Sequence, residues 1–337
     1  MSQSSKPVVA IALSEAMCRN MFRDADLDRL KVVADIRGPL VERGGSGQLA
    51  DLMSDARVVI TGWGTPPSEN ELIARLPTLG LIAHSAGSVK HLVNAYTFER
   101  GIRVSTAAGA NAVPVAQLTV GLMVTLLKQL PWIGEAYRKG NWDEVRRRKA
   151  VCRELQDMTI GLISASRVGR EVIKLLTGYP RLTIKLYDPF ITDAQARSMG
   201  VELASLDDVC RCEVVSIHAP NIPETRHMFN ARTLALLPDH AVLINTARGA
   251  ILDEAALVAE LHRRPLYVAL DVTDPEPPTP DSPLRTAPNL LLTPHVAGAM
   301  AQARHDMGQV AIEETIRFLQ GKSLRQEITR EMLPTQA

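Results

Sequence analysis

The sequence predicts an α/β protein with doubly wound parallel sheets and two domains. Short runs rich in Val and Ile recur along the chain, and they are apolar at nearly every position, as strands buried on both faces are. Longer amphipathic runs separate them, which is typical of strands joined by helices. The length of 337 residues exceeds what one hydrophobic core usually holds and so indicates two domains.

The expected strands fall into two blocks. The first block has strands at residues 8–13, 57–61 and 79–84, and the second at 158–164, 182–188, 213–218, 241–246, 266–272 and 289–295. Between the blocks, residues 111–130 are apolar nearly all round, which predicts a buried helix that crosses between domains or packs on a second subunit. A last helix is expected to stop at Gly321, and the proline-rich residues 274–283 are expected to form a loop.

Composition narrows the class of partner. Apolar residues make up 46% of the chain and charged residues 22%, as in soluble globular proteins. The net charge of +1 argues against a nucleic-acid partner, and the basic run 146–149 is interpreted as the solvated face of a helix. The four cysteines lack the spacing of a zinc site, so we expect no metal and reduced thiols. No signal peptide or membrane span is evident, which predicts a cytoplasmic location and no membrane partner.

The stretch "GLISASRVG" lies where a strand turns into a helix. It matches a dinucleotide-binding fingerprint in which Ser164 and Ser166 replace the first two glycines and Gly169 keeps the third. Phosphate binding there depends mainly on backbone N–H groups and the helix dipole, so we expect the loop to retain its cofactor. Ser166 could add a hydrogen bond to a phosphate oxygen.

Asp188 ends the next strand, 19 residues after Gly169. That spacing fits the carboxylate that binds the ribose hydroxyls of a dinucleotide, and an acid there would repel a 2′-phosphate. The expected cofactor is therefore NAD, with NADP less favoured. Asp188 could equally begin the turn "DPF" with no ligand at all.

Three later motifs, "NTARG", "DVTDPEP" and "TPH", follow strands of the second block. In this order and spacing they resemble the D-isomer-specific 2-hydroxyacid dehydrogenase family, and the similarity covers nearly the whole chain. The resemblance implies two Rossmann-like or flavodoxin-like domains, with a cofactor domain inserted into a substrate domain. Here that corresponds to residues 107–299, inserted between residues 1–106 and 300–337.

By that resemblance the catalytic residues are Arg248, Glu276 and His295. The chemistry agrees, because an imidazole can exchange a proton near neutrality and a carboxylate on its second nitrogen would fix its tautomer. A guanidinium matches a substrate carboxylate in two bonds. Each residue also has an ordinary structural explanation, namely a surface ion pair for Arg248, a solvated loop for Glu276 and a core histidine for His295.

The resemblance also implies the binding residues. Backbone N–H groups at Ala86 and Gly87 are expected to bind the substrate carboxylate together with Arg248, although a plain tight turn would also need Gly87. The residues expected along the cofactor are Ser166, Arg167, Val168, Asp188, His218, Ala219, Pro220, Thr225, Thr246, Ala247, Asp271 and Gly298. Asp271 could instead be a cap on the loop that follows its strand.

The expected function is hydride transfer between NAD(H) and a small D-2-hydroxy or 2-keto acid, by a homodimer. The alternative is a nonenzymatic NAD-binding scaffold or sensor of the same superfamily. Trp63 follows a strand of the first block and could line the substrate pocket or simply pack. Gln117 stands where the family commonly has Glu, and the sequence suggests no reason for the change.

Overall fold

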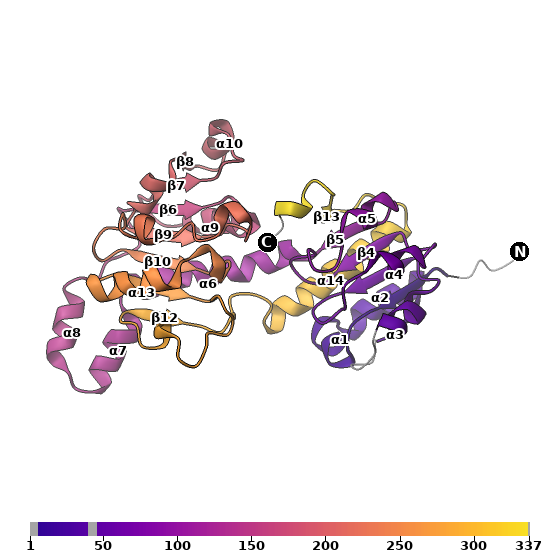
Figure 1. The fold of residues 1–337 in the computed structure, drawn as a ribbon, viewed down its shortest axis with the longest axis horizontal. Coiled ribbons are helices and arrows are strands. Elements are labelled where there is room, and N and C mark those ends of the chain that lie inside the picture. The colour runs from indigo at the N-terminus through magenta and orange to yellow at the C-terminus, as the bar shows by residue number, and fades with distance from the viewer. Residues whose placement is uncertain (1–5, 40–45, 336–337) are drawn as a thin grey trace, which may run out of the picture. The chain divides into compact units, whose positions relative to one another are not determined.

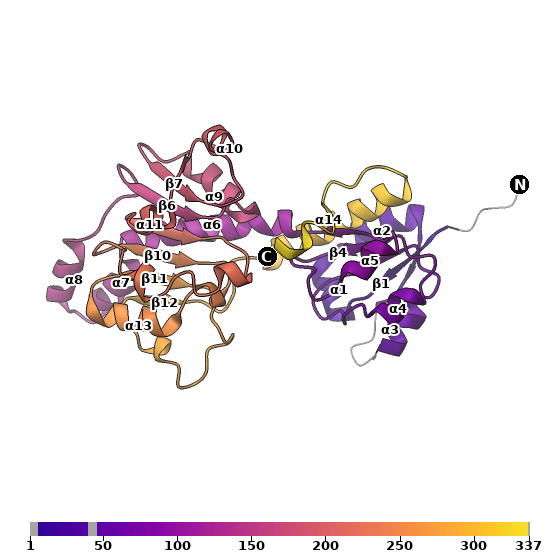
Figure 2. The same cartoon turned by 45° about the horizontal axis from the view of Figure 1, so that its top comes forward.

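The computed structural model describes residues 6–39 and 46–335 (Figures 1 and 2). The chain divides into two compact units. The flanking unit comprises the chain up to Asn111 and again from Ala299, and the inserted unit runs from Ala112 to Gly298. The sequence-based boundaries, 106/107 and 299/300, lie within a few residues of these.

The inserted unit is built on a seven-stranded parallel sheet. Its strand order is β12-β11-β10-β9-β6-β7-β8, so the chain starts in the middle, runs to one edge and then returns to fill the other. This is the order of a dinucleotide-binding fold, in which the ligand binds at the carboxyl ends of the strands, where the order reverses between β6 and β9. The strands are β6 (Thr159–Ile163), β7 (Thr183–Tyr187), β8 (Glu202–Leu203), β9 (Val214–Ile217), β10 (Val242–Asn245), β11 (Tyr267–Leu270) and β12 (Leu290–Leu292).

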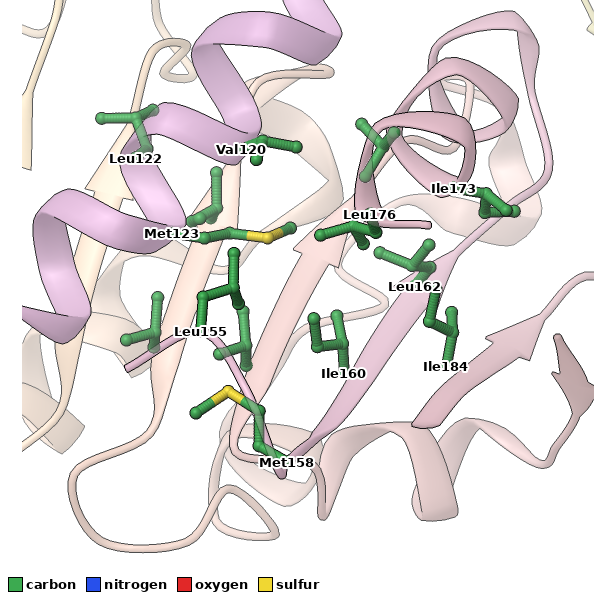
Figure 3. Packing of buried hydrophobic residues seen from close by; sticks show 14 of the residues in the cluster. Val120, Leu122, Met123, Leu155, Met158, Ile160, Leu162, Ile173, Leu176 and Ile184 are labelled. Carbon is green, nitrogen blue, oxygen red and sulfur yellow. The ribbon is translucent and has the colours of Figure 1, made fainter. Parts of the chain in front are cut away.

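Helices cover both faces of this sheet, because alternate residues of its strands point to opposite sides. Val242 and Ile244 of β10 join one core cluster, and Leu243 joins the other. Figure 3 shows part of the first cluster, which contains Met123 and Leu176 together with Ile160 and Leu162 of β6. The helices are α7 (Leu130–Arg138), α8 (Trp142–Lys149), α9 (Arg167–Leu176), α10 (Asp193–Ser198), α11 (Leu206–Cys210), α12 (Ala231–Leu234) and α13 (Glu254–Arg263), with short 3₁₀ turns η1 (Pro223–Thr225), η2 (Gly249–Ile251) and η3 (Pro283–Arg285).

The flanking unit contains a six-stranded sheet in the order β13-β5-β4-β3-β1-β2. The first five strands along the chain pair in parallel in the flavodoxin-like order, and β13 adds antiparallel to β5 at one edge of the sheet. The strands are β1 (Val8–Ile11), β2 (Asp35–Arg37), β3 (Val58–Thr61), β4 (Leu81–His84), β5 (Arg103–Thr106) and β13 (Glu327–Ile328). The helices are α1 (Glu15–Met21), α2 (Asp24–Val33), α3 (Ser46–Met53), α4 (Asn70–Ala74), α5 (Ala95–Glu99) and α14 (Ala301–Leu319), with a 3₁₀ turn η4 (Leu333–Thr335).

The α/β class with parallel sheets is confirmed, and each of the nine expected strands is present. The last helix ends at Leu319, and Gly321 follows with a φ of 68°, the conformation expected of a glycine that ends a helix. The interpretation of the basic run is right for Arg146 and Arg147 and wrong for Arg148. That side chain is only 19% exposed and stacks 5.4 Å from the centre of the Trp132 ring, because it bonds Gln129 and Asn289.

Helix α6 (Ala108–Leu127) begins in the flanking unit and continues into the inserted one. It is long and apolar enough to cross a membrane by length and composition alone, but half of this apolar stretch is buried inside the protein. Val120, Met123 and Leu126 lie in the first core cluster of the inserted unit. Helix α6 is thus a core helix, as its all-round apolar pattern predicts. Gln117 is exposed on it, and nothing in the structure explains its replacement of Glu.

Candidate active site

Three neighbouring strands, β10, β11 and β12, bring the three predicted catalytic side chains to one edge of the inserted sheet. The strands pair in register, with Asn245 opposite Leu270 and Leu270 opposite Leu292. Their carboxyl ends therefore lie side by side, and the loops that leave them carry Arg248, Glu276 and His295. Residues far apart in the sequence meet here because the parallel topology places successive strand ends at a common edge.

The imidazole of His295 is bonded to the carboxylate of Glu276. Its Nδ1 atom lies 2.6 Å from Oε1 of Glu276, and both side chains are partly exposed, 49% and 41%. This contact fixes the tautomer: with Nδ1–H donated to the carboxylate, Nε2 is the nitrogen that can accept or donate a proton.

The loop that carries His295 is held by the buried carboxylate of Asp271. Oδ1 accepts from the Thr293 hydroxyl at 2.6 Å and from the Val296 N–H at 2.9 Å, and Oδ2 accepts from the Ala297 N–H at 2.8 Å. The His295 N–H also donates to the Asp271 carbonyl. Asp271, which was predicted to lie along the cofactor, therefore positions the loop that carries His295. Three of the roughly four acceptor sites of its carboxylate are occupied.

The loop that carries Glu276 packs against the turn after β10. A Cβ added to Gly249 would lie 2.0 Å from the carbonyl carbon of Thr273 and 2.6 Å from the Asp274 nitrogen, so only glycine fits. The carboxylate of Glu254, at the start of α13, accepts from the Asp274 N–H at 2.7 Å. Burial raises the pKa of Glu254. These two contacts set the distance between the Arg248 turn and the Glu276 loop.

Arg248 is a half-buried cation without a carboxylate partner. Its Nη1 donates to the Ala247 carbonyl at 2.6 Å, and it forms no salt bridge with the carboxylates that the structure describes. Burial lowers its pKa while the charge of Glu276 opposes that shift, and a guanidinium stays protonated in either case. The turn around it is fixed by the Asn245 amide, which donates to the Arg248 carbonyl and accepts from the Ala247 N–H. An unpaired, half-buried cation at the carboxyl end of a strand favours an anionic ligand.

The glycine-poor loop adopts the shape of the fingerprint. Ser164, in the first glycine position, has a φ of 76°, the left-handed conformation for which glycine is normally required. Ser166 has an extended conformation and caps α9, accepting from the Gly169 N–H at 3.3 Å. A Cβ on Gly169 would lie 2.1 Å from the Ser164 carbonyl oxygen, so the third glycine is indispensable. Arg167 and Val168 form the first turn of α9.

Asp188 lies beside this loop, immediately after β7. Its Oδ2 accepts from the Ala165 N–H at 2.8 Å and from the Ser164 hydroxyl at 3.2 Å, and its Oδ1 accepts from the Phe190 N–H at 2.9 Å. The side chain thus serves the turn "DPF" and joins the loop to it, and it keeps a free acceptor site for a ribose hydroxyl.

The predicted residues after β9 line the same region of the inserted unit. His218 is 3% exposed, and both of its ring nitrogens lack a partner within the described part of the chain. Burial lowers its pKa to about 3. A Cβ added to Gly169 would lie 3.6 Å from the Cβ of His218, so His218 lies next to the loop. Thr225 donates to the Pro220 carbonyl at 2.6 Å and accepts from the Ile222 N–H, so it holds the turn that Ala219 begins.

This set of residues fits a dinucleotide. Four features occur together at the carboxyl end of β6: the N-terminus of α9, a close backbone approach at Gly169 that excludes any Cβ, a carboxylate next to the loop, and a buried imidazole whose two nitrogens are unpaired. Thr246 lies further along that edge with its hydroxyl 2.9 Å from that of Thr119, and Gly298 is the last residue of the inserted unit.

The flanking unit carries the predicted substrate loop at the end of β4. The N–H groups of Ala86, Gly87 and Ser88 donate to no main-chain oxygen of the described residues, and no atom lies within 4 Å of a Cβ built on Gly87. The Thr106 hydroxyl donates to the Ala86 carbonyl at 2.8 Å and also bonds the Gly87 carbonyl. With the carbonyls held by Thr106, the N–H groups remain open for an anion.

Sequence reasoning missed several residues that position this site. Asn245 and Thr293 could have been suspected from their places in "NTARG" and "TPH", but Glu254, Thr119 and Thr106 carry no local signal. Among the described residues, no group of three His, Cys, Asp or Glu side chains could hold a metal ion.

Comparison with known proteins decides the family. The family model described as "D-isomer specific 2-hydroxyacid dehydrogenase, NAD binding domain" matches residues 120–297, more than half of the chain. The chain belongs to the D-isomer specific 2-hydroxyacid dehydrogenase family. A glyoxylate reductase of Thermofilum pendens is 31% identical over 80% of this chain and 80% of its own length. The resemblance inferred from the three motifs is therefore confirmed, and so is NAD as the cofactor of the matched domain.

Further relatives and one solved structure extend the comparison. A D-3-phosphoglycerate dehydrogenase of Methanocaldococcus jannaschii is 30% identical over 91% of this chain. The chain spans about half the length of the curated phosphoglycerate dehydrogenases it matches, 58% of this one and 49% of the one from Archaeoglobus fulgidus. The apo structure of Rhodotorula graminis D-mandelate dehydrogenase has a TM-score of 0.82 with 20% identity and covers 96% of this chain and 98% of that one. This last likeness shows the shared fold.

Proposed function

We propose that the protein is an NAD-dependent D-2-hydroxyacid dehydrogenase that interconverts a small 2-keto acid and its 2-hydroxy acid. The 2.6 Å contact between His295 and Glu276, on the same sheet edge as the unpaired Arg248, carries this proposal. Retention of all three side chains favours an enzyme over a nonenzymatic scaffold, which would not need them.

The proposed roles follow from the charges. When bound, the reduced nicotinamide supplies the hydride. His295, as imidazolium, donates its Nε2 proton to the carbonyl oxygen of the keto acid, and Glu276 stabilises that imidazolium through Nδ1–H. Arg248 binds the substrate carboxylate and polarises the adjacent carbonyl, stabilising the negative charge that develops on its oxygen. In the reverse direction neutral His295 takes the hydroxyl proton.

The proposed division of labour assigns the cofactor to the inserted unit and the substrate to the flanking unit. The open N–H groups at residues 86–88 support a carboxylate ligand there. Trp63 follows β3 and is 38% exposed, on a turn in which the Thr65 hydroxyl donates to the Ala12 carbonyl at 2.6 Å. We place it in the substrate pocket, where it favours a 2-keto acid with an apolar side chain over glyoxylate.

We propose that the protein is a homodimer in the cytoplasm. Apolar side chains on α6, α7 and α8 are exposed, among them Leu130 at 55%, Tyr137 at 61% and Trp142 at 52%, and the last two rings pack edge to face at 5.2 Å. Exposed aromatic groups of this size favour a protein interface. Light scattering of the wild type and of Tyr137→Glu tests this assignment, with a dimer expected for the first and a monomer for the second.

The decisive experiment measures NADH oxidation with a panel of 2-keto acids. We expect turnover by the wild type, a loss of at least ~100-fold in His295→Ala, and a similar loss in Arg248→Lys, since lysine cannot form the two-bond contact. His262→Ala is the matched control, because His262 is an exposed histidine of the same unit. Unchanged turnover in His295→Ala would refute the assigned base. NADH binding without turnover of any acid would instead favour the scaffold.

A further inference from the structure

Ser164 is the residue at which this chain departs most from the dinucleotide fingerprint, and its hydroxyl has a specific partner. The Oγ atom lies 3.2 Å from Oδ2 of Asp188 and donates to it. The same oxygen accepts from the Ala165 N–H at 2.8 Å. A glycine at position 164 would leave the second contact and remove the first.

The contact from Ser164 matters because it occupies one of the few acceptor sites on the Asp188 carboxylate. A carboxylate has about four sites that can accept a hydrogen bond. Three are occupied here, by Ala165 N, Ser164 Oγ and Phe190 N, which leaves one. Without the serine hydroxyl two would be open, which matches the two hydroxyls of an adenosine ribose.

We propose that the Ser164 hydroxyl competes with the adenosine ribose for the Asp188 carboxylate and thereby weakens NAD(H) binding. The competition concerns the ribose only. The N-terminus of α9, Gly169 and the loop backbone keep the fingerprint geometry, so the phosphates are still held. This inference rests on the proposed function through the dinucleotide alone, and it makes Ser164 a determinant of cofactor affinity.

Two substitutions separate the hydroxyl from the backbone. Ser164→Ala removes Oγ but keeps a Cβ at the same φ of 76°, so it reports on the hydroxyl. Ser164→Gly also relieves the left-handed conformation, so the difference between the two variants reports on the backbone. Both avoid Gly169, whose replacement would clash with the Ser164 carbonyl.

The measurement is the dissociation constant of NADH and of reduced nicotinamide mononucleotide, determined by calorimetry on the full chain. The mononucleotide lacks the adenosine ribose. We expect Ser164→Ala to bind NADH about 3–10-fold more tightly than the wild type, the net effect of one ordinary hydrogen bond. The affinity for the mononucleotide should stay within twofold.

Other outcomes contradict the inference in distinguishable ways. Weaker NADH binding by Ser164→Ala would show that the hydroxyl contacts the cofactor instead of competing with it. An equal gain for both nucleotides would place the effect outside the ribose. Tighter binding by Ser164→Gly but not by Ser164→Ala would assign it to the backbone. A wild type that binds neither nucleotide would refute the proposed function as well.

Discussion

The Nδ1 atom of His295 lies 2.6 Å from Oε1 of Glu276, although 19 residues separate the two in sequence. We predict that Glu276→Gln lowers kcat for keto-acid reduction about 100-fold with little change in KM, because an amide accepts the same hydrogen bond but supplies no charge to stabilise the imidazolium. Steady-state kinetics test this, with the exposed Glu135→Gln as control. A kcat within twofold of the wild type would contradict the role of Glu276.

Gly249 is expected to tolerate no side chain. In Gly249→Ala the new Cβ meets the backbone at Thr273 and Asp274, so one of the two loops must move. We predict a loss of about 1–3 kcal/mol in the free energy of unfolding and at least a tenfold lower kcat/KM. Gly178→Ala is the control, since its Cβ would meet only the Leu175 carbonyl oxygen at an ordinary 3.6 Å. Equal effects of the two substitutions would disprove the close-approach argument.

Thr106 holds the carbonyls of the loop that we assign to the substrate carboxylate. Thr106→Val keeps the shape but removes the donor to Ala86 and Gly87. We predict that KM for the keto acid rises about tenfold, while kcat changes less than threefold and KM for NADH is unaffected. Thr106→Ser should restore the wild-type KM. A rise in both KM values would indicate general damage to the fold instead.

His84 makes the flanking unit sensitive to acid. Burial, aided by His91, lowers its pKa to about 4. The unfolded chain takes up this proton as the pH falls below about 6.5, whereas the folded protein does so only near pH 4. Between these values the unfolded state binds more protons. The free energy of unfolding therefore decreases as the pH decreases, by about 3 kcal/mol in total. At pH 7.5 and above His84 is neutral in both states and has no effect.

Urea denaturation between pH 7.5 and 4.5 measures this loss. His84→Asn can keep the hydrogen bond that Nδ1 makes with the Thr61 hydroxyl at 3.0 Å, and it should flatten the pH dependence. An unchanged slope in His84→Asn would assign acid lability to other groups, His218 first among them, because burial lowers its pKa as well.

Trp63 offers a test of substrate class. If its ring lines the pocket, Trp63→Ala should lower kcat/KM for phenylpyruvate about 10–100-fold relative to glyoxylate. Trp63→Phe should lie between Trp63→Ala and the wild type. Parallel changes for both acids would mean that Trp63 only packs.

The fold was largely predictable because its strands are buried on both faces. Such strands are apolar at every position, as in the run from Val242 to Ile244, so periodicity alone identifies them. Strands β2, β5, β8 and β13 escaped prediction because they are short or mixed with polar residues, such as Arg103 and Ser105 in β5. Three of the four, β2, β8 and β13, are edge strands, which need fewer apolar residues, so composition does not distinguish them from loops.

The site was predictable only where chemistry and strand ends coincide. Arg248, Glu276 and His295 follow expected strands, so their convergence could be inferred. The pairing of Asp271 with Thr293, or of Ser164 with Asp188, depends on the path of loops that no periodicity describes. The sequence suggested that Ser166 could donate a hydrogen bond to a phosphate. Its oxygen also caps α9, which no periodicity predicts, and its proton stays available to donate.

Arg248, Glu276 and His295 all belong to the single stretch from Ala112 to Gly298. The three residues to which we assign proton transfer and substrate binding are thus encoded in one uninterrupted segment, while the two loops that bear Trp63 and Gly87, after β3 and β4, are encoded outside it. A chimera that exchanges the outer segments with those of a relative should inherit that relative's choice of acid and leave the hydride chemistry as it was.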